Sequence, residues 1–251
     1  MDLVLLCLFG FLAGFIDAMV GGGGLIQLPA FFIFQPHLSL VQTLASNKTA
    51  SFLGTSVAAI QYIKKVSIEW KRLSVIMVLA FIGAFGGALL VSFIRKEQFM
   101  PFIIGTLLFV LGYLLTRKKL GVIHLEKRIS RSRYYVYAVT VGLLIGFYEG
   151  LIGPGAGSFL IFAFVVLFGD NFLHASAKAK IVNWVASLSA LVFFIFKGYV
   201  FWTLALPVAV ANMAGNYVGS HLAIKKGSRF IRIFFIAVVI ALIIKLAYDY
   251  L

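Results

Sequence analysis

Residues 10–24 read GFLAGFIDAMVGGGG, and residues 142–156 read GLLIGFYEGLIGPGA. Adding 132 to each number lays the first stretch on the second without gaps, so that the glycines at 10, 14, 21 and 23 meet glycines. Each stretch also carries a carboxyl in an apolar run just before a glycine-rich turn, Asp17 in one and Glu149 in the other. Such a fixed offset is typical of a chain built from two copies of one unit.

The same offset continues beyond these stretches and defines the expected domains. Matching lysine, tryptophan and glycine pairs are Lys48 with Lys180, Lys65 with Lys197, Trp70 with Trp202, Gly83 with Gly215, and Gly87 with Gly219. Lysine and tryptophan rarely coincide by chance in so apolar a chain. We therefore predict a first transmembrane repeat at residues 1–116, a basic linker at 117–133 and a second repeat at 134–251.

The composition predicts a membrane protein. Of 251 residues, 62% are hydrophobic and 12% are charged, and the mean hydropathy is +1.06, so a water-soluble exterior could not be built. The net charge of +14 would suggest nucleic acid in a soluble protein. Here the basic residues gather in short gaps between apolar runs, as in cytoplasmic loops. We expect the lipid bilayer of the cytoplasmic membrane as the surroundings and no nucleic-acid partner.

Each half contains five apolar stretches, which in the first half are residues 3–20, 25–34, 41–63, 73–94 and 99–115. A bilayer core about 30 Å thick needs roughly 20 helical residues per crossing, so the stretch 25–34 is too short to cross alone. With its predecessor it predicts a broken helix or re-entrant hairpin, and its counterpart is 159–168. The fold class is therefore all-α and polytopic, with a hairpin plus three transmembrane helices per repeat, or about eight spans by usual counting.

The loop charges favour inverted halves over parallel ones. If the hairpin makes no net crossing, each half crosses three times, and the second half then lies upside down. This arrangement keeps the basic linker and the cluster Lys225, Lys226, Arg229 and Arg232 inside, with both termini outside. A parallel arrangement would place that cluster outside, against the positive-inside rule.

The two glycine runs are candidate ligand-binding segments. Inverted repeats with interrupted helices often build a transport site near the bilayer midplane, where half-helix N-termini point backbone N–H groups at an anion. The residues expected to approach the ligand are Gly21, Gly22, Gly23, Gly24, Gly153, Gly155 and Gly157. The alternative is that these glycines serve close helix packing.

Asp17 and Glu149 are acidic residues within apolar segments and are repeat partners. A charge at the bilayer centre costs about 2.5 to 3.5 kcal/mol on insertion scales, so intramembrane carboxyls are functional candidates. We expect a role in proton coupling or gating. The alternative is structural, with each carboxyl capping backbone N–H groups at its glycine break.

Lys48 and Lys180, a second repeat pair, are candidate cations for an anionic substrate, with Asn47, Thr49 and Asn183 as neighbouring hydrogen-bonding groups. Ammonium groups offset the charge of an oxyanion, and hydroxyl and amide groups replace its water. Ser51 and Ser187 are further polar neighbours. The alternative is that the lysines extend to the lipid headgroups.

No cofactor, metal site or catalytic activity is expected. The histidines are scattered and none forms a pair at metal-ligand spacing, while Cys7 is the one cysteine. An intramembrane enzyme using Asp17, Glu149 and His174 as acid and base remains an alternative, although no nucleophile, base and orienting group occur together. A purely structural subunit would have little reason to keep paired carboxyls and lysines in apolar segments.

At this point the sequence resembles the TauE/SafE family of sulfite-exporter-like membrane permeases over nearly its full length. The resemblance is carried by Gly10, Gly14, Gly21 to Gly24, Pro29 and residues 45–49, and again by Gly142, Gly146, Glu149, Gly150, Gly153 to Gly157 and residues 175–180. It implies a multi-pass carrier of the cytoplasmic membrane for sulfite, sulfonates or related organic anions. We therefore expect a secondary anion transporter working by alternating access. A passive anion channel is the alternative.

Overall fold

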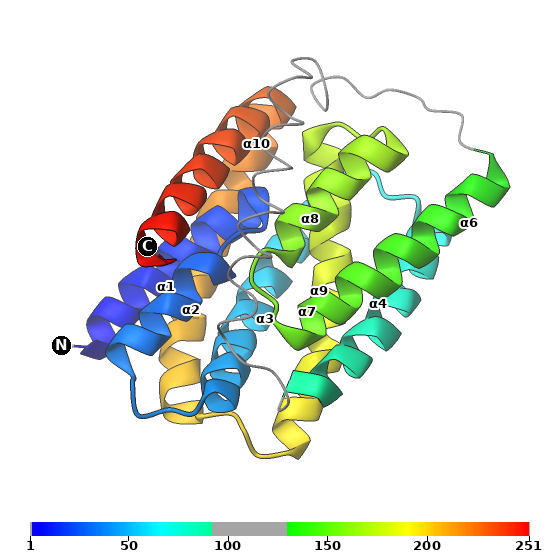
Figure 1. Cartoon of the computed structure of the whole chain (residues 1–251). Helices are drawn as coiled ribbons and strands as arrows, with labels where there is room; N and C mark the ends of the chain where they lie inside the picture. Colours follow the sequence, from blue (N-terminus) through cyan, green and yellow to red (C-terminus); the bar gives the residue numbers. More distant parts are fainter. Residues whose placement is uncertain (1, 92–129, 251) are drawn as a thin grey trace.

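The computed structural model describes residues 2–91 and 130–250, which form helices and short turns with no strand among them (Figure 1). The all-α prediction is confirmed for this part of the chain. The predicted stretch 99–115 and most of the predicted linker 117–133 lie outside the described residues.

The helices of the first half follow the predicted apolar stretches closely. They are α1 (Asp2–Val20), α2 (Gly24–Phe34), α3 (Leu40–Lys65) and α4 (Trp70–Leu90). Ser39 begins α3 with a capping box, in which its side chain and that of Gln42 each accept a hydrogen bond from the other residue's backbone N–H.

The second half repeats this order with more irregular helices. Its elements are α6 (Arg131–Thr140), the π-helical η3 (Val141–Ile145), α7 (Gly146–Leu151), α8 (Ala156–Ala163), the π-helical η4 (Phe164–Phe168), α9 (Phe172–Phe196) and α10 (Trp202–Tyr250). A kink at Gly227, where φ is 74°, divides α10. By the offset, the part before the kink corresponds to α4, and the part after it to the stretch 99–115.

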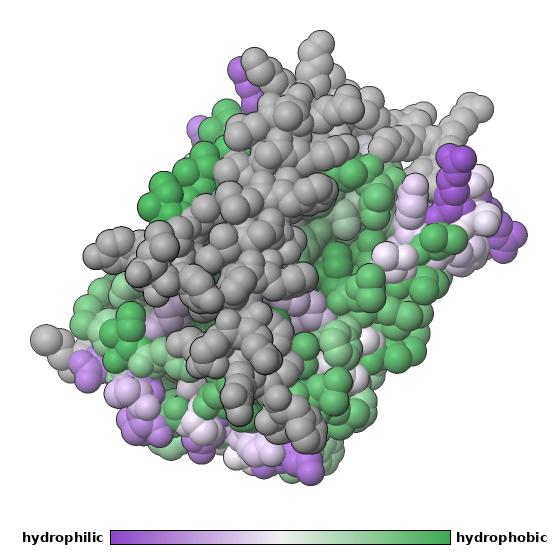
Figure 2. Space-filling view, in the orientation of Figure 1, coloured by the Kyte–Doolittle hydropathy of each residue, from purple (hydrophilic) through white to green (hydrophobic). Residues whose placement is uncertain are grey.

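The outer helices suit a membrane. In the described part, α1, α4, the continuous segment from α6 to α7 and α9 are long and apolar enough to cross a bilayer. Large apolar side chains such as Val4, Leu144 and Val210 are 66%, 65% and 68% exposed. Figure 2 shows apolar surface along α10 and α7, with hydrophilic residues gathered at the start of α6 and at the lower end of the molecule. The protein is membrane-embedded.

Each half packs its first helix against the fourth helix of the other half. Gly215 and Gly219 of α10 lie against the backbone of α1 at Phe11 and Phe15. By the offset, the equivalent contacts bring Gly83 and Gly87 of α4 against Leu143 and Phe147. In Figure 1 the pair α1 and α10 lies on one side and the pair α4 and α7 on the other, with α3 and α9 between them. The absence of Cβ atoms at these glycines permits such close backbone contact.

The equivalent helices α3 and α9 run antiparallel, as the inverted arrangement requires. Ser46, near the start of α3, accepts a hydrogen bond from the backbone N–H of Phe201, just beyond the end of α9. Ten residues further along α3, Ser56 accepts one from the indole of Trp184 at 2.7 Å. As residue numbers increase along α3, the contacted residue numbers decrease toward the start of α9, so the two helices run in opposite directions. The preference for inverted halves is confirmed.

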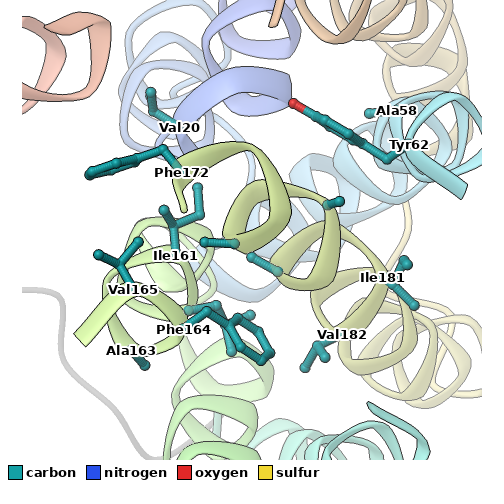
Figure 3. Close-up of a cluster of buried hydrophobic side chains, with 14 of the residues drawn as sticks. Val20, Ala58, Tyr62, Ile161, Ala163, Phe164, Val165, Phe172, Ile181 and Val182 are labelled. Carbon is teal, nitrogen blue, oxygen red and sulfur yellow. The ribbon is translucent and has the colours of Figure 1, made fainter. Parts of the chain in front are cut away.

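A hydrophobic core joins the end of α1 to the second half. Figure 3 shows Val20 of α1, Tyr62 of α3, Phe164 of η4 and Phe172 of α9 in this cluster. The hydroxyl of Tyr62, a fully buried residue, donates to the backbone oxygen of Ala18 at 2.9 Å. The core thus fixes the position at which α1 ends.

Candidate functional site

Both predicted glycine runs interrupt their helices with left-handed backbone. Helix α1 ends at Gly21, whose φ is 76°, and α2 begins three residues later at Gly24. In the second half, φ is 89° at Gly153 and 92° at Gly155, directly before α8. Residues with a side chain rarely adopt these angles, so glycine is needed at each of the three positions.

The two interruptions meet at the centre of the molecule. Gly21 lies directly against the backbone of Gly157, and Gly24 lies against Pro154. The hydroxyl of Ser158 donates to the backbone oxygen of Val20 at 2.7 Å, which ties the start of α8 to the end of α1. A Cβ atom at Gly21 or Gly157 would overlap the other residue's backbone.

Lys48 of α3 forms an ion pair with Glu149 of α7, in the other half. Its Nζ lies 2.8 Å from Glu149 Oε1 and also donates to the backbone oxygen of Glu149. The hydroxyl of Ser187 donates to the same Oε1 at 2.6 Å. Both charged side chains are nearly buried, with 5% and 6% exposed.

The repeat-equivalent pair joins Lys180 of α9 to Asp17 of α1. Lys180 Nζ lies 2.6 Å from Asp17 Oδ2, and Thr55 donates to the same oxygen at 3.2 Å. Thr55 and Ser187 are equivalent by the offset, as are the two lysines and the two carboxyls. Each lysine therefore pairs with the carboxyl of the opposite half, and the site has an approximate twofold symmetry.

These contacts argue against two alternatives for the charged groups, lysines at the headgroups and carboxyls that cap backbone N–H groups. The lysines do not extend to headgroups, because their side chains are only 5% and 1% exposed. Neither carboxylate caps a backbone N–H among the described residues; each accepts from a lysine and a hydroxyl instead. Two lysines and two carboxylates sum to zero charge, which makes their burial tolerable in a membrane.

A small cavity of about 20 Å³, counted as the space open to the centre of a water molecule, lies beside the two interruptions. Its lining consists of Asp17, Gly21, Gly24, Asn47, Lys48, Ser51, Thr55, Glu149, Gly153, Pro154, Gly155, Gly157 and Asn183. Polar and apolar atoms contribute about equally to its surface, and the lining includes amide, hydroxyl and charged side chains. The lining suits a small polar solute.

Most predicted site residues come together here, and a few lie behind the lining. Gly22, Gly23, Thr49 and Lys180 do not line the cavity. Gly23 packs against Ala13 and the Cβ of Asp17, and the hydroxyl of Thr49 donates to its own helix at 2.9 Å. These residues support the site from behind rather than facing a solute.

Thr55 was not among the predicted site residues, although a signal for it exists. It is the repeat equivalent of Ser187, so the offset could have indicated that each half supplies one hydroxyl to one carboxylate. Ser51 is similarly the equivalent of Asn183, and both line the cavity. Within the described part of the chain, the amide oxygens of Asn47 and Asn183 are buried without a hydrogen-bond partner. These amides are therefore available to a polar solute.

The described residues contain no group of three or more histidine, cysteine or acidic side chains that could hold a metal ion. Both carboxylates at the cavity are engaged by ammonium groups, which a metal cation would have to displace. The arrangement is instead that of two lysine–carboxylate pairs beside a small cavity.

Comparison with known proteins finds relatives over nearly the whole chain. The family model described as "Sulfite exporter TauE/SafE" matches residues 6–246. The chain is 36% identical to "Probable membrane transporter protein YfcA" of Escherichia coli (strain K12), over 95% of this chain and 87% of the relative. It is 32% identical to "Probable membrane transporter protein ORF9" of Sinorhizobium sp, over 98% and 93% of the two chains. No solved structure matches at a significant level.

Proposed function

The chain belongs to the TauE/SafE family of membrane transporters, and on this premise we propose that it carries a small anion across the cytoplasmic membrane by alternating access. The expected substrates are sulfite, a sulfonate or a related organic anion, because the family description names sulfite export. The carboxyls Asp17 and Glu149 serve coupling or gating in this proposal, not catalysis.

One observation carries the proposal: two lysine–carboxylate pairs cross between the halves where both helical hairpins are interrupted. Intramembrane charges cost about 2.5 to 3.5 kcal/mol each on insertion scales, so pairs of this kind mark ion pathways. Lys48 supplies N–H donors at the cavity, and Asn47 and Asn183 supply amide groups. Helices α2 and α8 begin at lining residues, so the positive ends of their dipoles favour an anion.

The duplication supports alternating access as the mechanism. Inverted halves can exchange conformations, which exposes one central site first to one side of the membrane and then to the other. The contact of Gly21 with Gly157 supports a proposal in which this exchange occurs at the interruptions themselves. Asp17 and Glu149 bind lysines across the same boundary, so the state of these carboxyls affects the contact between the halves.

Transport is tested with purified protein in liposomes loaded or bathed with sulfite. We expect saturable uptake by the parent, and loss of uptake in the double variant Lys48→Gln with Glu149→Gln. The double change removes both charges together, which avoids a buried unpaired ion. The exposed Lys197→Ala variant is the matched control and should transport normally. Undiminished uptake by the double variant would contradict the proposed site.

Counterflow separates a carrier from the alternative, a passive anion channel. A carrier exchanges labelled sulfite outside for unlabelled sulfite inside, and the unlabelled anion accelerates entry. A channel conducts without such acceleration. We expect acceleration; its absence, together with unsaturable flux, would replace the carrier proposal with the channel.

The proposed topology places both termini outside and the basic turns inside. Lys226, an exposed residue just before the kink of α10, is a suitable reporter position. In a protein with Cys7→Ser and Lys226→Cys, a membrane-impermeant thiol reagent added to intact cells should fail to label the cysteine. Labelling from outside would show that the protein has the opposite orientation in the membrane.

A further inference from the structure

Each lysine of the site already holds a carboxylate from the opposite half, so a substrate anion has to compete with an internal one. We propose, as a step that rests on the proposed function, that the two pairs work unequally. The substrate displaces Glu149 from Lys48, and Glu149 takes up one proton in exchange, while the pair of Lys180 and Asp17 stays closed.

The first argument is access. Lys48 and Glu149 both line the cavity, so an anion in that space reaches the ammonium group directly. Lys180 lies behind Asp17, does not line the cavity and has a side chain only 1% exposed. An anion can therefore replace Glu149 without replacing Asp17.

The second argument is that Lys48 has support that Lys180 lacks. Besides the carboxylate, its Nζ donates to the backbone oxygen of Glu149, and this bond remains when the side chain moves away. The only acceptor that Lys180 Nζ has among the described residues is Asp17. Gly153 adds room, because a Cβ there would lie 2.6 Å from Lys48 Nζ.

The third argument is the charge balance. When the hydrogen bond from Lys48 to Glu149 Oε1 is replaced by one to a substrate oxygen, the released carboxylate finds no unpaired cation at the cavity among the described residues. Lys178 is held by Asp170 at 2.8 Å and Lys180 by Asp17 at 2.6 Å. A buried carboxylate without a partner is costly, so a proton from water binds to it. One negative charge and one proton enter together, and a monovalent anion moves no net charge.

The surroundings of Glu149 offer a place for that proton. Oε1 already accepts from Lys48 and Ser187, whereas Oε2 accepts no hydrogen bond from the described residues. The charged groups that face this carboxyl in the described structure are Lys48 from α3 and, across the cavity, Asp17 from α1 with its partner Lys180 from α9. The negative charge of Asp17, although paired with Lys180, disfavours an unpaired carboxylate nearby.

The experiment measures protons, anions and voltage together in proteoliposomes. Methanesulfonate is the main probe because it stays monovalent, and sulfite is the second probe. For the parent we expect about one proton per methanesulfonate anion and a rate that an imposed membrane potential does not change. For Glu149→Gln we expect proton movement to disappear and anion movement to become sensitive to the potential.

The matched variant Asp17→Asn tests the inequality of the pairs. It should transport more slowly but keep the parent's proton-to-anion ratio, as should Lys197→Ala. If Asp17→Asn loses proton movement while Glu149→Gln keeps it, the assignment is wrong. Should Glu149→Gln fail to fold, Glu149→Asp replaces it and should retain the ratio with a shifted pH profile; an unchanged profile would count against Glu149.

The outcomes separate this inference from the function on which it rests. If the parent moves neither probe, the transport proposal itself fails. If the parent transports anions with a net movement of charge and without protons, the proposed transport function is kept and the proton exchange at Glu149 is refuted.

Discussion

Two equivalent interfaces of the molecule, α1 with α10 and α4 with α7, share their glycine contacts but differ in what else they contain. On α10 the interface carries Asn212, Asn216 and Ser220, all buried. At the equivalent positions α4 carries Ala80, Ala84 and Ala88. The polar side chains of α10 form hydrogen bonds within α10 and to Gln27 of α2, whereas α4 offers only small apolar side chains at these positions.

The amides form a chain through the bundle. Asn216 Nδ2 donates to Asn212 Oδ1 at 2.7 Å, and Asn212 Nδ2 donates to Gln27 Oε1 at 2.7 Å. Gly54 of α3 leaves the space for these groups, since a Cβ there would overlap Asn212. Such bonds between helices add on the order of 1 kcal/mol in membranes. The comparison teaches that the duplicated halves kept their crossed ion pairs while diverging in how the surrounding helices are held.

The largest expected difference lies between the two ion pairs. Asp17→Asn leaves Lys180 buried without a partner, which costs about 3 to 5 kcal/mol. Glu149→Gln should cost less, because Lys48 keeps the backbone oxygen of Glu149. Thermal unfolding of the detergent-purified variants measures the difference. The neutral double variant Asp17→Asn with Lys180→Met should recover stability, and equal losses for the two single variants would contradict the inequality.

The second-largest difference in stability is expected between substitutions of the equivalent glycines Gly21 and Gly153 at the interruptions. Gly21→Ala forces a side chain onto left-handed backbone and into the backbone of Gly157, for a cost of about 3 kcal/mol or more. Gly153→Ala carries the same strain but meets the flexible end of Lys48, so about 1 to 2 kcal/mol is expected. Unfolding temperatures rank the two. A larger loss for Gly153→Ala would mean that the halves do not meet at Gly21.

The amide chain should show a smaller effect. Asn212→Ala introduces the alanine found at the equivalent position of α4 and leaves the buried Oε1 of Gln27 without its donor, while Asn216 keeps its bond to the backbone oxygen of residue 212. The expected cost is about 2 kcal/mol. The neighbouring lipid-facing change Met213→Ala is the control and should be nearly neutral. If both changes have the same effect on unfolding, the amides do not distinguish the interfaces.

The two hydroxyls should give the smallest difference. Ser187→Ala removes a donor 2.6 Å from Glu149, and about 1 kcal/mol is expected. Thr55→Val removes a longer bond of 3.2 Å to Asp17, so its effect should be smaller still. The unfolding temperatures of the two variants measure this difference. A greater loss of stability for Thr55→Val than for Ser187→Ala would contradict the expected order.

Much of the fold could be predicted because the length of each apolar stretch and the repeat between the two halves can both be read directly along the sequence. The helices α1 to α4 begin and end close to the predicted stretches, and the short stretch 159–168 lies within α8 and η4. The π-helical turns η3 and η4 were not predicted, since they have no distinct residue pattern. Residues on both sides of Gly227 were expected as separate stretches, and the non-helical backbone at Gly227 does separate two helical parts of α10.

The sequence predicted which charged residues belong to the site, but not which lysine pairs with which carboxylate. Asp17, Glu149, Lys48 and Lys180 stand out as repeat partners in apolar segments. Their crossed pairing depends on α3 lying near α7 and α9 near α1, which is a matter of tertiary packing between residues 101 and 163 positions apart. The chain of Gln27, Asn212 and Asn216 was missed because these amides have no counterpart in the other half.

The crossed pairs also bear on how the chain is made. Asp17 and Lys48 leave the ribosome well before Glu149 and Lys180 exist, so during synthesis both early charges wait in the membrane for partners. We expect an N-terminal half expressed alone to be degraded, whereas two halves divided within residues 117–133 and made in one cell should complete each other. The charges are thus fully paired only when α9, which carries Lys180, has been inserted.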